Sequence, residues 1–427
     1  MSTDERRLKT LDSHLRPSNA FPGSSRGLWE TIPEAPPDPI LGITESFNAD
    51  SSENRLNLGV GAYRTEELKP LVLGSVKKAE RIVVEDPTAD KEYQPIGGNP
   101  NFCALSRRLA LGGAGGAEAE GRVATVQCLS GTGALRVGAE FLAAHHPLRA
   151  VHVPDPTWGN HPKIFGDAGL QVRRYRYYHP ATRGLDYTGM LQDLRSAPNG
   201  SVVVLHACAH NPTGVDPSKD QWRGILQAVC DKGHLVFFDS AYQGFASGDL
   251  EEDAFSVRLF ADAGLEMVLA QSFAKNMGLY GERVGALSFV TATKDAARRV
   301  ESQLKSIIRA LYSSPPRHGA AIAEKVLSNA DLFEEWKTEL RGMAERIKQM
   351  RTLLHSELTR LGTPGSWTHI LEQIGMFSYT GLTKAQCENM RKWHVYMSMD
   401  GRISMAGLSR QGCPHLAAAI DDSVRRF

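Results

Sequence analysis

The chain has 427 residues, enough for about two or three domains. Its 49 basic residues nearly balance its 48 acidic ones, and the net charge of +1 excludes a general field for capturing nucleic acid or an anionic membrane. No apolar run could span a bilayer, the N-terminus lacks the apolar core of a secretory signal, and the scattered cysteines form no zinc or redox motif. We expect a non-secreted protein with reduced thiols, no metal, and no nucleic-acid or membrane partner.

The chain divides by composition into four segments. Residues 1–27 are polar and rich in Ser and Arg, so they are predicted to be an extension outside the fold. Residues 28–70 are predicted to form an N-terminal arm and the first part of a small domain. Residues 71–341 are expected to form a large domain, and residues 342–427 the rest of the small domain.

Apolar runs alternate with helical patterns in the middle of the chain, which predicts the α/β class with a mostly parallel sheet covered by helices on both faces. Long helical patterns follow from residue 293, and the runs QIGMFSYTGL and RISMAGLS predict a second, smaller α/β layer. The expected strands of the main sheet are residues 123–129, 150–155, 201–207, 235–240, 267–273 and 286–292.

Ligands of doubly wound α/β folds bind beyond the carboxyl ends of the strands, so the residues that follow each apolar run are the candidates. Residues 130–133, SGTG, precede a helical pattern and suit a phosphate, although a simple capped helix is the alternative. Asp239 ends a buried strand and needs a cationic or N–H partner, unless it is a helix cap or a structural ion pair. His206 and His210 precede the turn NPTG and are interpreted as structural histidines.

Lys275 follows another apolar run and lies near Ser272 and Arg283 in sequence. A serine and an arginine beside a glycine cradle are what a phosphate dianion requires. A nicotinamide enzyme is the competing interpretation, but Gly131 and Gly59 each begin a GxG that is not completed to GxGxxG. A phosphate cradle, a strand-end acid and a lysine together fit pyridoxal 5'-phosphate.

Ten ordered motifs then resemble those of the eukaryotic aspartate aminotransferases, which are pyridoxal phosphate enzymes of fold type I. The resemblance covers residues 28–427. The motifs are APPDPILG, LNLGVGAYRTEE, KEYQPIGG, LSGTG, PTWGNHPKIF, HACAHNPTG, FDSAYQGFASG, SFAKNMGLYGERVG, QIGMFSYTGL and GRISMAGLS.

The resemblance implies a role for each candidate residue. Lys275 would bond to the cofactor aldehyde and move a proton between the substrate α-carbon and C4' of the cofactor, while Asp239 would pair with the pyridine nitrogen. The other implied cofactor contacts are Trp158 and Ala241 on the two ring faces, Tyr242 and Asn211 at the phenolic oxygen, Ser130, Gly131, Thr132, Ser272 and Arg283 at the phosphate, and Tyr93 from the other subunit. His161 and His206 would support Asp239. The resemblance also implies cis peptides before Pro156 and Pro212.

Substrate binding is implied for Arg402 at the α-carboxylate and for Arg309 at the distal carboxylate, because a guanidinium accepts a carboxylate in two places. Gly61, Trp158 and Asn211 would also contact the substrate. Arg309 and Tyr93 would reach the other subunit's site, so a homodimer with shared sites is expected. The implied reaction converts L-aspartate and 2-oxoglutarate to oxaloacetate and L-glutamate. An aminotransferase with aromatic or other preference and a non-catalytic relative remain the alternatives.

The N-terminal segment carries one further pattern. Wound as a helix, Arg7, Leu8, Leu11, His14 and Leu15 would share one stripe. The order Arg-Leu, five residues, His-Leu resembles the type 2 peroxisomal targeting signal, so residues 7–15 are predicted to bind an import receptor and the protein to be peroxisomal. A cytoplasmic protein with a chance match is the alternative.

Overall fold

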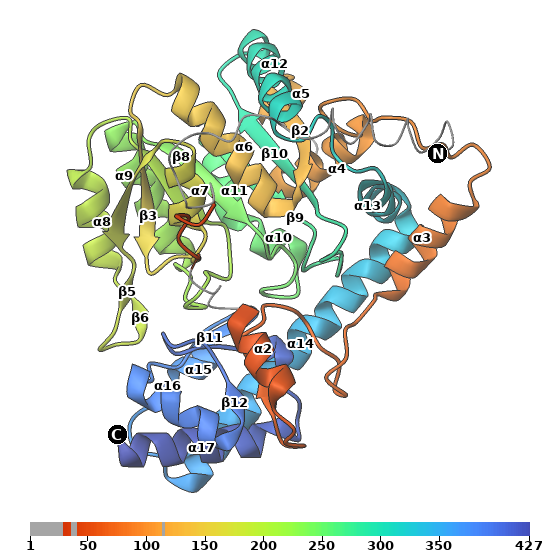
Figure 1. Cartoon of the computed structure of the whole chain (residues 1–427). Helices are drawn as coiled ribbons and strands as arrows, with labels where there is room; N and C mark the ends of the chain where they lie inside the picture. Colours follow the sequence, from red (N-terminus) through yellow and green to blue (C-terminus); the bar gives the residue numbers. More distant parts are fainter. Residues whose placement is uncertain (1–28, 36–40, 113–115) are drawn as a thin grey trace, which may run out of the picture.

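The computed structural model describes residues 29–35, 41–112 and 116–427 (Figure 1). The predicted targeting segment of residues 1–27 lies outside the described residues. Figure 1 shows a large α/β body and a smaller group of helices and short strands, joined by the long helix α14 (Ala330–Leu361).

A seven-stranded sheet forms the centre of the large body, in the order β2-β10-β9-β8-β7-β3-β4. Five of its strands, β9, β8, β7, β3 and β4, pair in parallel, whereas β10 is antiparallel to both of its neighbours. The bounds are β2 Val123–Leu129, β3 Ala150–Asp155, β4 Gln171–Arg176, β7 Val202–His206, β8 Leu235–Ser240, β9 Met267–Ser272 and β10 Val284–Val290. The predicted α/β class with a mostly parallel sheet is confirmed.

The apolar runs become strands because the sheet is covered on both faces, and each strand can then be apolar on both sides. Strands β7, β9 and β10 are buried at every position. The sequence QVRRYR of β4 was not predicted as a strand. It is the exposed edge of the sheet, so its polar residues carry no apolar pattern.

Helices cover the sheet in two layers. One layer buries its apolar residues on one face of the sheet and consists of α6 (Ser130–His145), α7 (His161–Asp167) and α12 (Lys294–Leu311). The opposite layer contains α5 (Gly116–Ala119), α8 (Tyr187–Ser196), α9 (Lys219–Lys232) and α11 (Phe255–Asp262), with α10 (Leu250–Asp253) leading into α11. A short hairpin of β5 (Tyr178–His179) and β6 (Gly184–Leu185) extends beyond the sheet.

A third core joins the two parts of the chain. It includes side chains of α3 (Gly74–Glu85), α4 (Pro100–Leu111), α13 (His318–Ser328) and α14, and it continues into the smaller part. Fully buried residues along α14 run from Trp336 to Leu358. The helix therefore packs against both parts, as Figure 1 shows.

The smaller part contains two pairs of short strands. The first, β1 (Leu56–Asn57) and β12 (Val395–Tyr396), joins a segment near the start of the chain to one near its end. The second, β11 (Phe377–Tyr379) and β13 (Arg402–Ser404), confirms the predicted second layer. The helices are α2 (Leu41–Ala49), α15 (His369–Glu372), α16 (Lys384–Met390), η1 (Arg391–Trp393), η2 (Met405–Gly407) and α17 (Gly412–Arg426). The predicted domain limits at residues 70 and 341 stay a prediction, and the second falls inside α14.

The structure also bears on the expectations for the cysteines, the cis peptides and membrane-spanning helices. All six cysteines are free, and Cys230 alone among them is exposed. The peptides before Pro156 and Pro212 are both cis, as the resemblance implied. Among the described residues, no helix combines the length and apolar character that crossing a bilayer requires.

Candidate active site

A pocket of about 210 Å³ opens where the ends of the central strands meet the smaller part of the chain. Strands β7, β8 and β9 run in parallel, so the residues that follow them converge at one edge of the sheet. The pocket is lined by Gly61, Ser130, Gly131, Thr132, Leu135, Trp158, His206, Cys208, Asn211, Asp239, Ala241, Tyr242, Ser272, Lys275, Arg283, Phe377 and Arg402.

The first turn of α6 forms one wall of the pocket. The helix begins at Ser130. Its N-cap residue is Leu129, whose apolar side chain accepts no hydrogen bond from the first turn. Ser130 Oγ lies 2.9 Å from Ser272 Oγ, and a Cβ on Gly131 would lie 3.2 Å from the Cβ of Ser272. Free N–H groups, two hydroxyls and a missing side chain make this turn a cradle for an anion.

Gly285 supports the cradle from behind and was missed by the sequence reasoning. Ser130 has a φ of +61°, and β10 passes directly against this turn. A Cβ on Gly285 would lie 2.5 Å from both the Gln271 oxygen and the Ser130 carbonyl carbon, so only glycine permits the approach. A glycine inside an otherwise apolar strand is the signal that could have found it.

Lys275 projects into the pocket from the segment after β9. Burial lowers the pKa of Lys275; the Asp239 carboxylate opposes this shift and the Arg283 guanidinium adds to it. The Lys275 Nζ lies 5.8 Å from the ring centroid of Tyr242. A lysine with a lowered pKa has more of the neutral amine that bonds to a carbonyl or accepts a proton.

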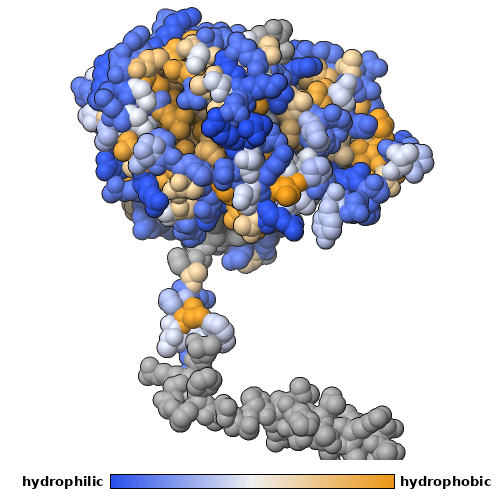
Figure 2. All heavy atoms as spheres, turned by 90° about the horizontal axis from the view of Figure 1, so that it is seen from above, coloured by the Kyte–Doolittle hydropathy of each residue, from blue (hydrophilic) through white to orange (hydrophobic). Residues whose placement is uncertain are grey.

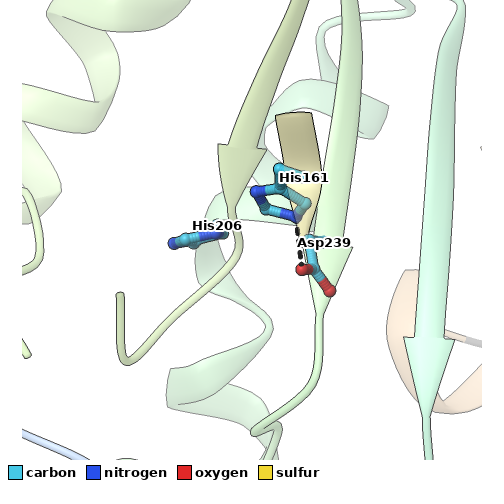
Figure 3. A group of neighbouring side chains, drawn as sticks. All are labelled: His161, His206 and Asp239. Carbon is cyan, nitrogen blue, oxygen red and sulfur yellow. Dashed lines mark hydrogen bonds and ion pairs between the residues drawn. The ribbon is translucent and has the colours of Figure 1, made fainter. Parts of the chain in front are cut away.

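Asp239 lies at the floor of the pocket, beside His161 and His206 (Figure 3). His161 Nε2 is 3.0 Å from Asp239 Oδ2, and His161 Nδ1 is 2.7 Å from the Thr157 hydroxyl. Since the carboxylate can only accept, Nε2 carries a proton, and in the neutral tautomer Nδ1 accepts from the Thr157 hydroxyl. Burial raises the pKa of Asp239, but the hydrogen bond and charges around it more than offset this, so the pKa lies below its usual value.

His206 and His210 continue this buried cluster. Their ring centroids are 4.3 Å apart, and His210 stacks on Tyr177 at 3.9 Å. Burial lowers the pKa of His206 to about 3 and that of His210 well below its usual range, so both rings are neutral. Atoms of His161, His206 and Asp239 lie within 4.8 Å of one another, a grouping of the kind that binds metals. We interpret it instead as the support of Asp239, because Asp239 lines the same pocket as Lys275 and the anion cradle.

The remaining predicted cofactor contacts also lie in the pocket. Trp158 and Ala241 are half-buried, whereas Asn211 and Tyr242 are buried. Burial raises the pKa of Tyr242, and the nearby Asp239 charge adds to the shift, so its phenol is protonated and able to donate. Arg283 lines the pocket at the cradle end, where its Nη1 donates to the Tyr280 oxygen at 2.9 Å.

Arg402 enters the pocket from β13. Its Nη2 donates to the Gly59 oxygen at 2.8 Å, its Nη1 lies 3.4 Å from Asn211 Oδ1, and its buried Nε has no partner among the described residues. Its guanidinium lies 4.3 Å from the ring centroid of Phe377. A guanidinium with an unpartnered donor, in the pocket that Lys275 also lines, fits a carboxylate. Phe377 itself was missed, because an apolar residue in a short strand gives no sequence signal for a site.

Two predicted site residues lie outside the pocket. Tyr93 is 84% exposed, and Arg309, in the last turn of α12, is also exposed. Gln94 Nε2 donates to the Pro316 oxygen at 3.0 Å, so the segment next to Tyr93 contacts the segment that follows α12. Within one chain, neither side chain reaches Lys275.

The pocket fits pyridoxal phosphate on three observations. The uncapped turn at Ser130 fits the phosphate, the Lys275 amine with its lowered pKa fits the aldehyde, and Asp239 fits a protonated ring nitrogen. Asp239 Oδ2 accepts from His161, and no side chain of the described residues donates to Oδ1. The fold and the pocket are those of a pyridoxal phosphate-dependent enzyme of fold type I.

Comparisons with known proteins agree with this class. The family model of aminotransferase class I and II matches residues 53–420. Cytoplasmic aspartate aminotransferase of Oryza sativa subsp. japonica is 58% identical over 95% of this chain and 100% of its own. The structure of the cytoplasmic aspartate aminotransferase of Saccharomyces cerevisiae is 42% identical, with a TM-score of 0.92 over 94% of this chain and 99% of its own.

A third relative shows the cofactor. The aromatic-amino-acid aminotransferase of Burkholderia pseudomallei, solved covalently bound to pyridoxal phosphate, is 44% identical, with a TM-score of 0.90 over 93% of this chain and 100% of its own. The chain belongs to the class I and II aminotransferases. It is a pyridoxal phosphate-dependent transaminase.

Proposed function

We propose that the enzyme transfers the amino group of L-aspartate to 2-oxoglutarate, giving oxaloacetate and L-glutamate in two half-reactions at one site. The observation that carries this proposal is Arg402, a buried guanidinium with an orphaned Nε that lines the same pocket as Lys275. An α-carboxylate held by Arg402 lies beside the amine that handles the α-proton. The relatives in rice and yeast, both named aspartate aminotransferases, support the choice of substrate.

The residues of the chain divide the chemical work. The bound cofactor supplies an electron sink for the electrons of the substrate Cα–H bond. Lys275 Nζ accepts the α-proton, which its lowered pKa favours. Asp239 would keep a proton on the ring nitrogen of the cofactor, and His161 holds the Asp239 carboxylate in place by donating from Nε2. Tyr242 and Asn211 would hold the phenolic oxygen of the cofactor, and the Ser130 turn with Ser272 and Arg283 would hold its phosphate, since all of these residues line the pocket.

We also propose a homodimer in which Arg309 and Tyr93 of the partner subunit complete each pocket. Both side chains are exposed, and the segment next to Tyr93 contacts the segment that follows α12. Residues 29–35 stand away from the body between grey segments in Figure 2, and Trp29 and Ile32 there are 73% and 60% exposed. A second subunit would cover this apolar arm and bring a second guanidinium to the distal carboxylate.

Mixing two inactive variants tests this arrangement. Lys275→Ala and Arg309→Asp subunits are unfolded together, refolded and assayed. If Arg309 acts across the interface, the mixed dimers contain one intact site and about a quarter of the wild-type activity returns. If Arg309 acts within its own chain, or the chain is a monomer, no activity returns.

Substrate preference separates the proposed enzyme from the aromatic alternative, which the similarity to the Burkholderia pseudomallei enzyme keeps in view. We expect aspartate to be turned over with a far larger kcat/KM than phenylalanine. In Arg309→Asp, activity with aspartate should fall much more than activity with alanine, because only aspartate carries a second carboxylate. Equal losses would show that Arg309 does not select the substrate. A non-catalytic relative would lack the visible absorption of a lysine-bound cofactor.

We propose, finally, that the enzyme is peroxisomal, which rests on the Arg-Leu, five residues, His-Leu pattern of residues 7–15. The cytoplasmic rice relative is consistent with the alternative location. A fluorescent protein that carries residues 1–27 should co-localise with peroxisomes and become diffuse after Arg7→Ala with His14→Ala. Diffuse fluorescence from the unchanged fusion would favour the cytoplasm.

A further inference from the structure

Arg351 is a buried cation that the proposed reaction does not use. It lies on α14 and is 2% exposed. Its guanidinium donates to three main-chain oxygens, those of Ile370 at 3.2 Å, Gly375 at 2.9 Å and Phe377 at 2.6 Å. Burial lowers the pKa of Arg351 to about 9, and no charged neighbour offsets the shift. A buried charge with only carbonyl partners is costly, so its position needs an explanation beyond ordinary packing.

The carbonyls that Arg351 holds belong to the segment that leads into the pocket. Phe377 begins β11, is 3% exposed and lines the pocket. The Arg402 guanidinium lies over the Phe377 ring at 4.3 Å, and β11 pairs with β13, the strand of Arg402. At the tip of the ring, a Cβ on Gly61 would lie 2.8 Å from Phe377 Cζ. The ring is therefore enclosed, and a shift of the Phe377 main chain would move the surface on which Arg402 lies.

The same segment is tied to the large part of the chain. Ile374 N donates to the Gly214 oxygen at 2.8 Å, and a Cβ on Gly214 would lie 2.8 Å from the Phe377 oxygen. Gly214 ends the turn that begins at Asn211, which itself contacts Arg402. Arg351 thus holds, from α14, the point at which the two parts of the chain meet behind the carboxylate site.

We propose that Arg351 is a positioning residue that sets the orientation of the Arg402 guanidinium by holding the main chain of Phe377. This inference rests on the proposed function only for the identity of the carboxylate substrate. It assigns Arg351 to substrate binding, not to proton transfer, because its contacts lead to Arg402 and not to Lys275 or Asp239. Loss of its donors should therefore weaken carboxylate binding more than it slows the bound substrate.

The test compares Arg351→Lys and Arg351→Met with Arg360→Lys, a matched control on the same helix whose side chain is exposed and pairs with Glu357. Lysine keeps the charge but has a single donor atom, and methionine keeps the apolar stem alone. For each holoenzyme, KM and kcat for aspartate are measured, together with the Kd of succinate by calorimetry and the cofactor content. We expect Arg351→Lys to raise KM and Kd about tenfold with kcat changed by less than about threefold, and Arg360→Lys to change none of them.

A double-mutant cycle with Phe377→Leu tests the route. In that background the ring is absent, so Arg351→Lys should change the succinate Kd by less than about twofold. Three results would overturn the proposal. They are unchanged KM and Kd in a folded Arg351→Lys, a full tenfold effect in the Phe377→Leu background, or a parallel fall of kcat, cofactor content and thermal stability. Arg351→Lys decides the question if Arg351→Met does not fold.

Failure of the proposed function would have a different signature. An enzyme that forms no oxaloacetate from aspartate refutes the substrate assignment in the wild type. The ratio of succinate Kd values between Arg351→Lys and the wild type still reports on Arg351.

Discussion

Replacing Arg402 with lysine tests how the pocket binds the substrate α-carboxylate. The guanidinium has three donor atoms. Nη2 donates to the Gly59 oxygen, Nη1 lies near Asn211 Oδ1, and Nε has no partner among the described residues. A lysine presents one nitrogen at the end of a flexible stem. In Arg402→Lys this nitrogen cannot hold the Gly59 oxygen and two carboxylate oxygens in the same geometry.

The magnitude follows from the bonds lost. A hydrogen bond between charged groups contributes about 1.5–3 kcal/mol, so losing one of the pair to the carboxylate should lower kcat/KM by about 10- to 150-fold. The loss should appear with both aspartate and 2-oxoglutarate, because the two half-reactions use the same site. Burial lowers the pKa of Arg402, and a lysine there would be desolvated as well, which adds to the loss.

The assay measures kcat/KM separately for the amino acid and the oxo acid. Arg410→Lys is the control, because Arg410 is exposed and contacts Gln349 away from the pocket. A kcat/KM within about threefold of the wild type in Arg402→Lys would refute the reasoning, since no lost charged hydrogen bond would be detectable. A loss with one of the two substrates alone would also contradict a shared α-carboxylate site.

Three further predictions follow from the pocket and its surroundings. Lys275→Ala should remove measurable transamination and the absorption of a lysine-bound cofactor while circular dichroism stays that of the wild type; normal turnover would show that another group moves the proton. Because the folded pKa of His206 is about 3, below the unfolded value of 6.5, its stabilising effect is complete above pH 6.5 and is lost as the pH falls toward 3. This loss is about 1.4 kcal/mol per pH unit. The free energy of unfolding in urea should therefore depend less on pH between about 6 and 4 in His206→Gln than in the wild type. Equal slopes of this free energy against pH would contradict the neutral ring. Gly285→Ala places a Cβ 2.5 Å from the Gln271 oxygen and should cost about 1–3 kcal/mol of stability and weaken cofactor binding, whereas Gly281→Ala, which meets nothing within 4 Å, should be neutral; equal effects would show that the strand shifts freely.

Several features could be predicted because they depend on local pattern. The run LVFFDS became β8 with its predicted bounds, since a parallel strand covered on both faces is apolar at nearly every position. The SGTG motif indicated an anion site at a helix start, because N–H groups of a first turn are unpaired wherever the helix lies. Asp239 lies at the end of β8 and Lys275 follows the end of β9, and parallel strands bring their ends to one edge. The resemblance of the motifs supplied the expected roles of these residues.

Other features depended on which distant segments pack together. His161 meets Asp239 across 78 positions of the chain, and no periodicity encodes that contact. The polar strand β4 exists because β3 offers it an edge, so its partner decides its structure and not its own pattern. Phe377 and Gly285 are ordinary strand residues by sequence. Phe377 gains a role because Arg402 packs over its ring, and Gly285 gains one because Ser130 approaches its main chain.

Arg351 shows most clearly what sequence alone leaves open. In a helix where charged residues alternate with apolar ones, an arginine is expected to be solvated. The sequence around Arg351 on α14 does not indicate that this arginine is buried. In the folded chain it is buried and donates to the oxygens of Ile370, Gly375 and Phe377. The sequence by itself indicated where six of the seven main strands lie along the chain, and it pointed to the candidate anion-binding turn and the candidate lysine. The tertiary structure decided which side chains support them, because burial and hydrogen-bond partners are properties of the packed chain.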